Sequence, residues 1–259
     1  MSASTDANGA FNDAPIERGW QSLRLIGGVA ALAAALVFRR WLSAEFGMLQ
    51  NLGVVRFRLD VTPTTPVEWF TLLETHRFVG ALLLNAFDLV NYLLAALMYL
   101  GIYSQLRTDR GAHLMVALAC TIAGTSVYLS SNQSLALLSL SRQYFATGSE
   151  SQRQLLLAAG QFALTANDPV AFGTGVFWSY MLFYLAGLIL SIGMVTNHRF
   201  TKWIGIVGVV ANAFGLCYFV TSLIGPTMDI IPALGSAPTN LVWYMAVGIS
   251  LVRRGVRQT

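Results

Sequence analysis

The sequence predicts an all-α integral membrane protein, a bundle of about six transmembrane helices with one additional helix outside the bilayer. Of the 259 residues, 55% are hydrophobic and only 11% are charged, against about 25% charged in soluble domains. The hydrophobic residues form continuous runs of about 20 residues, the length that crosses a hydrocarbon core of about 30 Å. Because these runs do not alternate with a period of two, a β-barrel is not expected.

Six runs are the predicted spans. They cover residues 20–38, 78–103, 113–138, 171–196, 203–224 and 239–252. The first has a short uninterrupted apolar part, and the sixth is short as a whole. Residues 1–17 are polar and acidic, unlike a secretory signal peptide, and they predict a disordered cytoplasmic tail. Residues 18–259 are predicted to form a single bundle domain.

The basic residues predict the orientation of the bundle. The short turns 103–113 and 196–202 and the C-terminal residues are basic, whereas the long segments 39–74 and 142–168 mix arginines with acidic residues. We therefore expect a multi-pass protein of the cell membrane, with both termini in the cytoplasm and both long segments external. Topology accounts for the net positive charge, so nucleic acid is not an expected partner. The lipid bilayer is one, and a membrane protein partner stays open.

Two motifs predict where helices begin. Residues 65–68, Thr-Pro-Val-Glu, form a capping box, and the helix that starts there is expected to continue without interruption to Tyr103. About 38 residues give nearly 60 Å of helix, so this helix must project from the membrane or bend near Gly80. Residues 149–152 open an external helix, 150–166. Its apolar face at Leu155 and Phe162 is expected to pack on residues 66–77.

Asp88 is the most informative polar residue of the predicted spans. It follows the expected start of the second span by ten residues, or about 15 Å of helix, which places it near the bilayer midplane. An aspartate at that depth costs about 2.5–3.5 kcal/mol to insert and suggests a functional site. We expect it to be protonated and hydrogen-bonded, because burial disfavours the charged form.

Other polar side chains are predicted to join Asp88 in a midplane layer, because they share its helix face or the same depth on other spans. The candidate residues for ligand binding or proton handling are Asp88, Asn85, Tyr92, Tyr128, Asn132, Tyr184 and Asn212. The alternative is a purely structural layer of interhelical hydrogen bonds, each contributing about 0.6 kcal/mol. The sequence leaves both interpretations open.

The remaining patterns do not predict a catalytic, metal or cofactor site. Glu74 and Arg77 are spaced i,i+3, which favours an exposed ion pair over an acid–base or metal cluster. The three histidines lie at span ends, so a bis-histidine haem is not expected. Cys120 and Cys217 fall inside predicted spans and are expected to be packing residues. We expect no cofactor.

Four features carry a family resemblance. These are the long segment after the first span, the pattern of Arg77, Asn85, Phe87 and Asp88, the external helix before the fourth span, and the stretch 184–206. With them, the chain from about residue 20 onward resembles the bacterial multi-span membrane proteins of the domain of unknown function 4386 family. That family has no assigned activity, so the resemblance implies a fold and no catalytic residue.

Three classes of function stay open on the sequence alone. The first expectation is a non-catalytic membrane protein, either a partner subunit or a lipid-interacting protein. The second is a transporter or small-molecule binder, which could be coupled to protons, that uses the midplane layer. The third is an intramembrane enzyme acting on a lipid or isoprenoid. A paired carboxylate would favour the enzyme, but Asp88 is alone in the predicted spans.

Overall fold

The computed structural model describes residues 19–37, 63–107, 111–224 and 230–257. These ranges are helical apart from short connections and contain no β-strand, which confirms the all-α fold class. The predicted tail, residues 1–17, lies outside the described residues. The helices are the N-terminal helix Gly19–Val37, α3 Pro66–Thr75, α4 Arg77–Leu83, α5 Asp88–Leu106, α6 Gly111–Ser131, α7 Ser134–Ala146, α8 Glu150–Asn167, α9 Gly175–Val195, α10 Lys202–Ser222 and α11 Ile230–Arg257.

Five helical segments among the described residues are long and apolar enough to cross a membrane, which confirms the bundle. They are the N-terminal helix, α5, α9, α10 and the 36-residue rod Gly111–Ala146 that α6 and α7 form together. The predicted sixth span lies within α11, whose 28 residues are long enough. The segment 236–240 of α11 is polar, however, and α11 is not among the five. A sixth crossing therefore stays a prediction.

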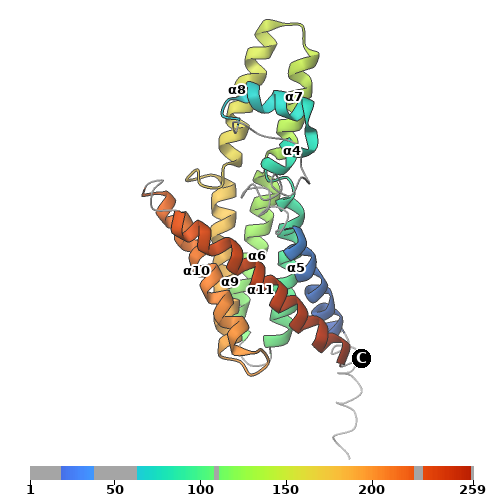
Figure 1. Ribbon diagram of the computed structural model, residues 1–259, viewed down its shortest axis with the longest axis vertical. Coiled ribbons are helices and arrows are strands. Elements are labelled where there is room, and N and C mark those ends of the chain that lie inside the picture. Colours follow the sequence, from blue (N-terminus) through green and yellow to red (C-terminus); the bar gives the residue numbers. More distant parts are fainter. Residues whose placement is uncertain (1–18, 38–62, 108–110, 225–229, 258–259) are drawn as a thin grey trace, which may run out of the picture.

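Helix α9 lies at the centre of the bundle, with α6 on one side and α10 on the other. Helix α11 packs on α10 and runs obliquely across the other long helices (Figure 1). The N-terminal helix meets α5 and α11 at two glycines. A Cβ on Gly27 would lie 2.7 Å from the Cα of Gly101, and one on Gly28 would lie 2.8 Å from a methyl group of Val252. Such small residues let membrane helices approach closely.

One end of the bundle, which we call the basic end, gathers the arginines that the sequence groups together. The guanidinium of Arg254 lies 5.6 Å from the ring centroid of Phe200, and that of Arg107 lies 4.2 Å from the ring centroid of Trp20. Burial, and then repulsion by Arg199, lowers the pKa of Arg254. Both ends of the described chain therefore lie here. Which side of the membrane the basic end faces stays a prediction.

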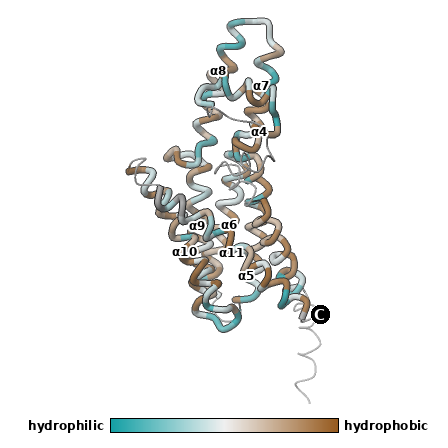
Figure 2. The backbone as a smooth tube through the Cα atoms, in the orientation of Figure 1, coloured by the Kyte–Doolittle hydropathy of each residue, from teal (hydrophilic) through white to brown (hydrophobic). Residues whose placement is uncertain are grey.

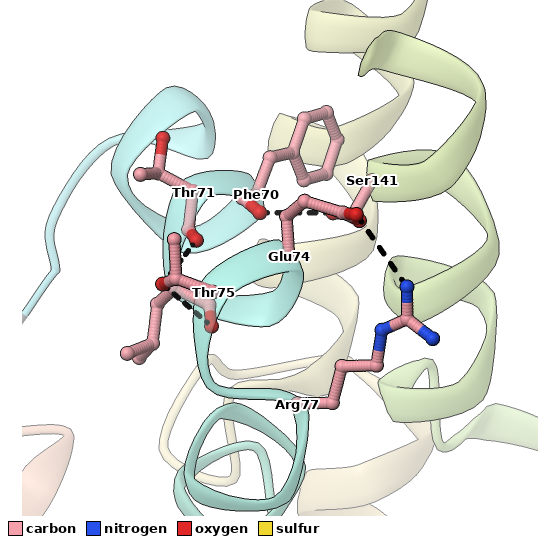
Figure 3. Close-up of polar contacts among 7 residues, drawn as sticks. Phe70, Thr71, Glu74, Thr75, Arg77 and Ser141 are labelled. Carbon is pink, nitrogen blue, oxygen red and sulfur yellow. Dashed lines mark hydrogen bonds and ion pairs between the residues drawn. The ribbon is translucent and has the colours of Figure 1, made fainter. Parts of the chain in front are cut away.

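At the opposite end, which we call the hairpin end, α7 and α8 form an antiparallel hairpin that extends beyond the other helices (Figure 1). Hydrophobic residues prevail along the bundle, whereas the tip of the hairpin is hydrophilic (Figure 2). Helix α3 packs on the hairpin, with the fully buried ring of Phe70 against Gly160 of α8. The Ser141 hydroxyl donates to the carbonyl oxygen of Phe70 at 2.9 Å (Figure 3). The predicted packing of α8 on α3 is thus confirmed.

The predicted contact face of α8 is wrong. Leu155 and Phe162 are 72% and 73% exposed. The residues of α8 that are buried are Leu156, Gly160, Ala163 and Asn167. Helix α8 carries two apolar stripes offset by one residue, and only the stripe with Gly160 admits the Phe70 ring, since a Cβ there would lie 2.6 Å from it.

The predicted continuous helix from residue 65 to Tyr103 is also wrong. Its capping box is present, because the Thr65 side chain accepts from the Glu68 amide while the Glu68 side chain accepts from the Thr65 amide. The chain breaks at His76, however, and again at residues 84–87, where Asn85 has a φ of 59°. Asparagine is among the few residues that adopt this left-handed conformation readily. Within the rod Gly111–Ala146, the helix is likewise interrupted at residues 132–133, between α6 and α7.

Candidate functional site

The helix break changes the depth of Asp88. Asp88 is the first residue of α5, not the tenth of a longer span. Nineteen residues at 1.5 Å each give about 28 Å, which matches the hydrocarbon thickness. Asp88 therefore lies at the end of α5 that faces the hairpin end, and the helix start from which its midplane depth was counted is wrong.

The carboxyl of Asp88 points into the bundle and meets a tyrosine. The Tyr180 hydroxyl donates to Asp88 Oδ2 at 2.6 Å, a length typical of a strong hydrogen bond to a carboxylate. The partner predicted on α9 is Tyr184, which lies one turn deeper on the same helix face. Sequence reasoning missed Tyr180 because it counted depth from a span that starts at residue 78. The break at residues 84–87 makes Asp88 the start of the helix instead.

Two further tyrosine rings, those of Tyr92 and Tyr128, pack against Tyr180 of this pair. The rings of Tyr92 and Tyr128 stack with centroids 3.9 Å apart and planes 5° apart, and Tyr180 meets both edge to face. Tyr92 and Tyr128 are almost completely buried. The structure thus brings together Asp88, Tyr92 and Tyr128 of the predicted site. We call these three residues and Tyr180 the outer layer.

Asparagine side chains connect the outer layer to the helix breaks. Asn132 Nδ2 donates to the Tyr128 hydroxyl at 3.0 Å, and that hydroxyl donates to the carbonyl oxygen of Asn85 at 3.4 Å. Asn167, buried at the end of α8, donates to the carbonyl oxygen of Leu84 and accepts from the amide of Gln133, both at 2.9 Å. Asn85 and Asn132 of the predicted site are thus connected through the Tyr128 hydroxyl, whereas Asn167 gave no sequence signal.

Asn212 belongs to a second, deeper group. It lies halfway along α10, fully buried, and its Nδ2 donates to the carbonyl oxygen of Gly208 at 2.7 Å. An added Cβ on Gly208 would overlap Ser191 Oγ and Trp243 Nε1, and one on Gly187 would overlap Asn212 Oδ1 and the Tyr99 hydroxyl. We call the group of Tyr99, Ser191, Asn212 and Trp243 the midplane layer.

Two polar atoms of the midplane layer have no hydrogen-bond partner among the described residues. They are Asn212 Oδ1 and Trp243 Nε1, both in fully buried side chains. Tyr184 lies between the two layers, with its ring against Gly215. The single predicted layer is therefore two layers, and only Asn212 of the predicted residues lies in the deeper one.

A groove opens at the hairpin end, between the end of α6, the base of α8 and the start of α9. Its volume is about 410 Å³, and its lining residues are Ser130, Ser131, Gln133, Phe162, Thr165, Ala166, Gly173, Thr174 and Gly175. None of these is ionisable. The aromatic residues Phe162, Phe172 and Trp178 are exposed on this end of the molecule. Sequence reasoning missed this groove, because its residues come from three separate segments.

No family model, curated protein or solved structure matches this chain. The resemblance to the domain of unknown function 4386 family therefore stays a prediction.

Two other sequence patterns can be placed. Arg77 Nη2 lies 3.4 Å from Glu74 Oε1, and both side chains are exposed (Figure 3). The predicted surface ion pair is thus confirmed. Among the described residues, no group of three or more histidine, cysteine, aspartate or glutamate side chains could hold a metal ion.

Proposed function

We propose that this protein is a non-catalytic, lipid-interacting membrane protein that binds a phospholipid headgroup in the groove at the hairpin end. The position of the groove carries the proposal. Ser130 and Ser131 end α6, and Gly175 begins α9. Helices α6 and α9 have 21 residues each, or about 31 Å, which is close to the thickness of the hydrocarbon core. We take their common end, where the groove lies, as the level of the headgroups.

The outer layer supports a non-catalytic role. The carboxyl of Asp88 binds a tyrosine hydroxyl rather than a second carboxyl, and the ring of that tyrosine packs edge to face on the stacked rings of Tyr92 and Tyr128. The packing of Asp88 favours a structural hydrogen bond.

Filling the groove tests the proposal. Ala166 lines the groove, whereas Ala158 lies on the exposed face of the same helix, about 12 Å along it. We expect Ala166→Trp to lose phospholipid that the purified wild-type protein retains in native mass spectrometry, and Ala158→Trp to keep it. Equal retention by Ala166→Trp and wild type would show that lipid binds elsewhere or without a site.

The exposed stripe of α8 favours a second candidate function, that of a partner subunit. Leu155 is 72% exposed on a hairpin that stands beyond the spans, and Ala158 and Ala159 extend the stripe. Photo-crosslinking from position 155 in native membranes, compared with position 154, tests for a protein partner. Adducts of equal yield at both positions would argue against a specific one.

We also propose that the basic end faces the cytoplasm of the cell, with both termini on that side. Exposed basic turns support this orientation. Position 198 is exposed in the turn between α9 and α10, whereas Phe200 beside it is buried. In a variant without Cys120 and Cys217, a cysteine at 198 should resist an impermeant thiol reagent in intact cells, and one at 148 should react. The reverse pattern would overturn the orientation.

A further inference from the structure

Three of the four hydroxyl groups that line the groove already donate their protons to the main chain. The Ser130 hydroxyl donates to the carbonyl oxygen of Val127 at 3.0 Å, and the Thr165 hydroxyl donates to that of Gln161 at 3.1 Å. The Thr174 hydroxyl likewise donates to the carbonyl oxygen of Ala171 at 2.9 Å. A hydroxyl has one proton and two lone pairs, so Ser130 and Thr165 offer acceptors to a ligand.

The amide of Gln133 adds to this pattern. Its Nε2 donates to the carbonyl oxygen of Ser131 at 3.2 Å, which directs a donor of this side chain to the main chain. No lysine, arginine or histidine is among the lining residues. Free acceptors and the absence of a positively charged side chain favour a group that brings several N–H donors.

We infer that the groove selects a primary ammonium group, the headgroup of an aminophospholipid such as phosphatidylethanolamine. This inference rests on the proposed function and names its ligand. A primary ammonium carries three N–H donors, whereas the quaternary ammonium of phosphatidylcholine carries none. Both lipids carry the same phosphate, so the acceptors of the groove are what distinguishes them. The exposed Phe162 ring gives the lipid an apolar surface beside the headgroup.

The test is competition between two lipids with identical acyl chains. The purified full-length protein, freed of lipid, is offered an equal mixture of phosphatidylethanolamine and phosphatidylcholine, and the retained lipid is identified by native mass spectrometry. We expect several-fold enrichment of phosphatidylethanolamine. The double variant Ser130→Ala/Thr165→Val should lose most of this enrichment, because it removes two acceptors at exposed positions.

A matched control exists at the basic end. The Thr196 hydroxyl donates to the carbonyl oxygen of Ile192 at 3.1 Å, the same i−4 geometry as Thr165, and Thr196 is also exposed. Thr196→Val should leave the enrichment unchanged.

The outcomes separate the two proposals. Equal retention of both lipids by the wild type would overturn the inference and leave the proposed function standing, whereas retention of neither would overturn both. Enrichment that survives the double variant would overturn the assignment to these hydroxyls. If free ethanolamine at millimolar concentration displaces the lipid, a soluble amine rather than a lipid is the ligand, and the assignment to a lipid fails.

Discussion

The outer and midplane layers solve the same problem, polar side chains inside a membrane bundle, in opposite ways. The outer layer lies where helices break. Its side chains bond one another, and the neighbouring Asn132 and Asn167 bond this layer and the main chain that the breaks expose. The midplane layer lies in continuous helices, where glycines make room for polar side chains. There two buried polar atoms lack partners among the described residues. Helix breaks thus supply hydrogen-bond partners for buried polar groups, whereas glycine contacts supply only the space for them.

The largest effect is expected from filling the space that glycine leaves in the midplane layer. In Gly208→Ala, the new methyl group would overlap Ser191 Oγ and Trp243 Nε1, both in fully buried side chains. Overpacking of a rigid core costs about 3 kcal/mol or less. We expect close to this loss in the free energy of unfolding, measured by denaturant titration in detergent micelles.

Gly111→Ala is the control, because an added Cβ there has no neighbour within 4 Å. Its stability should stay close to that of the wild type. A Gly208→Ala protein as stable as Gly111→Ala would mean that the midplane layer is loosely packed, and the contrast between the layers would fail.

The next effect concerns the helix breaks beside the outer layer. Asn167→Ala removes the partner of two main-chain groups at once, the carbonyl oxygen of Leu84 and the amide of Gln133. A buried group left unpaired costs about 1–3 kcal/mol, so we expect a loss of about 2 kcal/mol in the same titration. Asn197→Ala, at the basic end, removes an asparagine that accepts from the amide of Arg199 two residues away. That local loss should be smaller, and equal losses would show that Asn167 does not join the breaks.

The contact of Asn167 also separates what the sequence could predict from what it could not. Apolar runs and the capping box depend on nearby residues, so the bundle, the start of α3 and the bounds of α8 were predictable. The break at residues 84–87 contains neither proline nor glycine. It is held by Asn167, a contact across 83 residues. Sequence reasoning did not include that contact, so it miscounted the depth of Asp88. It therefore also chose the wrong partner on α9, Tyr184 in place of Tyr180.

A smaller loss of stability is expected from substitutions of Asp88 in the outer layer. Asp88→Leu removes one intramembrane hydrogen bond, that of Tyr180, so we expect a loss of about 1 kcal/mol or less. Asp88→Asn keeps an acceptor for the Tyr180 hydroxyl and should be close to the wild type in both stability and lipid retention. A folded and inserted Asp88→Asn protein that loses lipid retention or another activity would assign Asp88 a functional role and end its interpretation as a structural residue.

The smallest effect is expected outside both layers, at the start of α3, where polar groups meet water. The amide of Thr64 and then that of Thr65 donate to Glu68 Oε2, at 2.7 and 3.2 Å, and they lower the pKa of Glu68 below its ordinary value of 4.5. Since the folded pKa is the lower one, this carboxylate stabilises the helix start above the ordinary value. The contribution disappears as the pH falls through the folded pKa. Amide exchange, corrected for intrinsic rates, should therefore show lost protection in the first turn of α3 upon acidification, while the spans stay protected.

Glu68→Gln should remove this pH dependence and Glu74→Gln should keep it, because Glu74 contacts Arg77 rather than the helix start. If the first turn of Glu68→Gln opened with acid as the wild type does, the capping box would not be the titrating element. Confined to one exposed turn, the effect would show that acid acts on the surface of the hairpin end and leaves both buried layers intact.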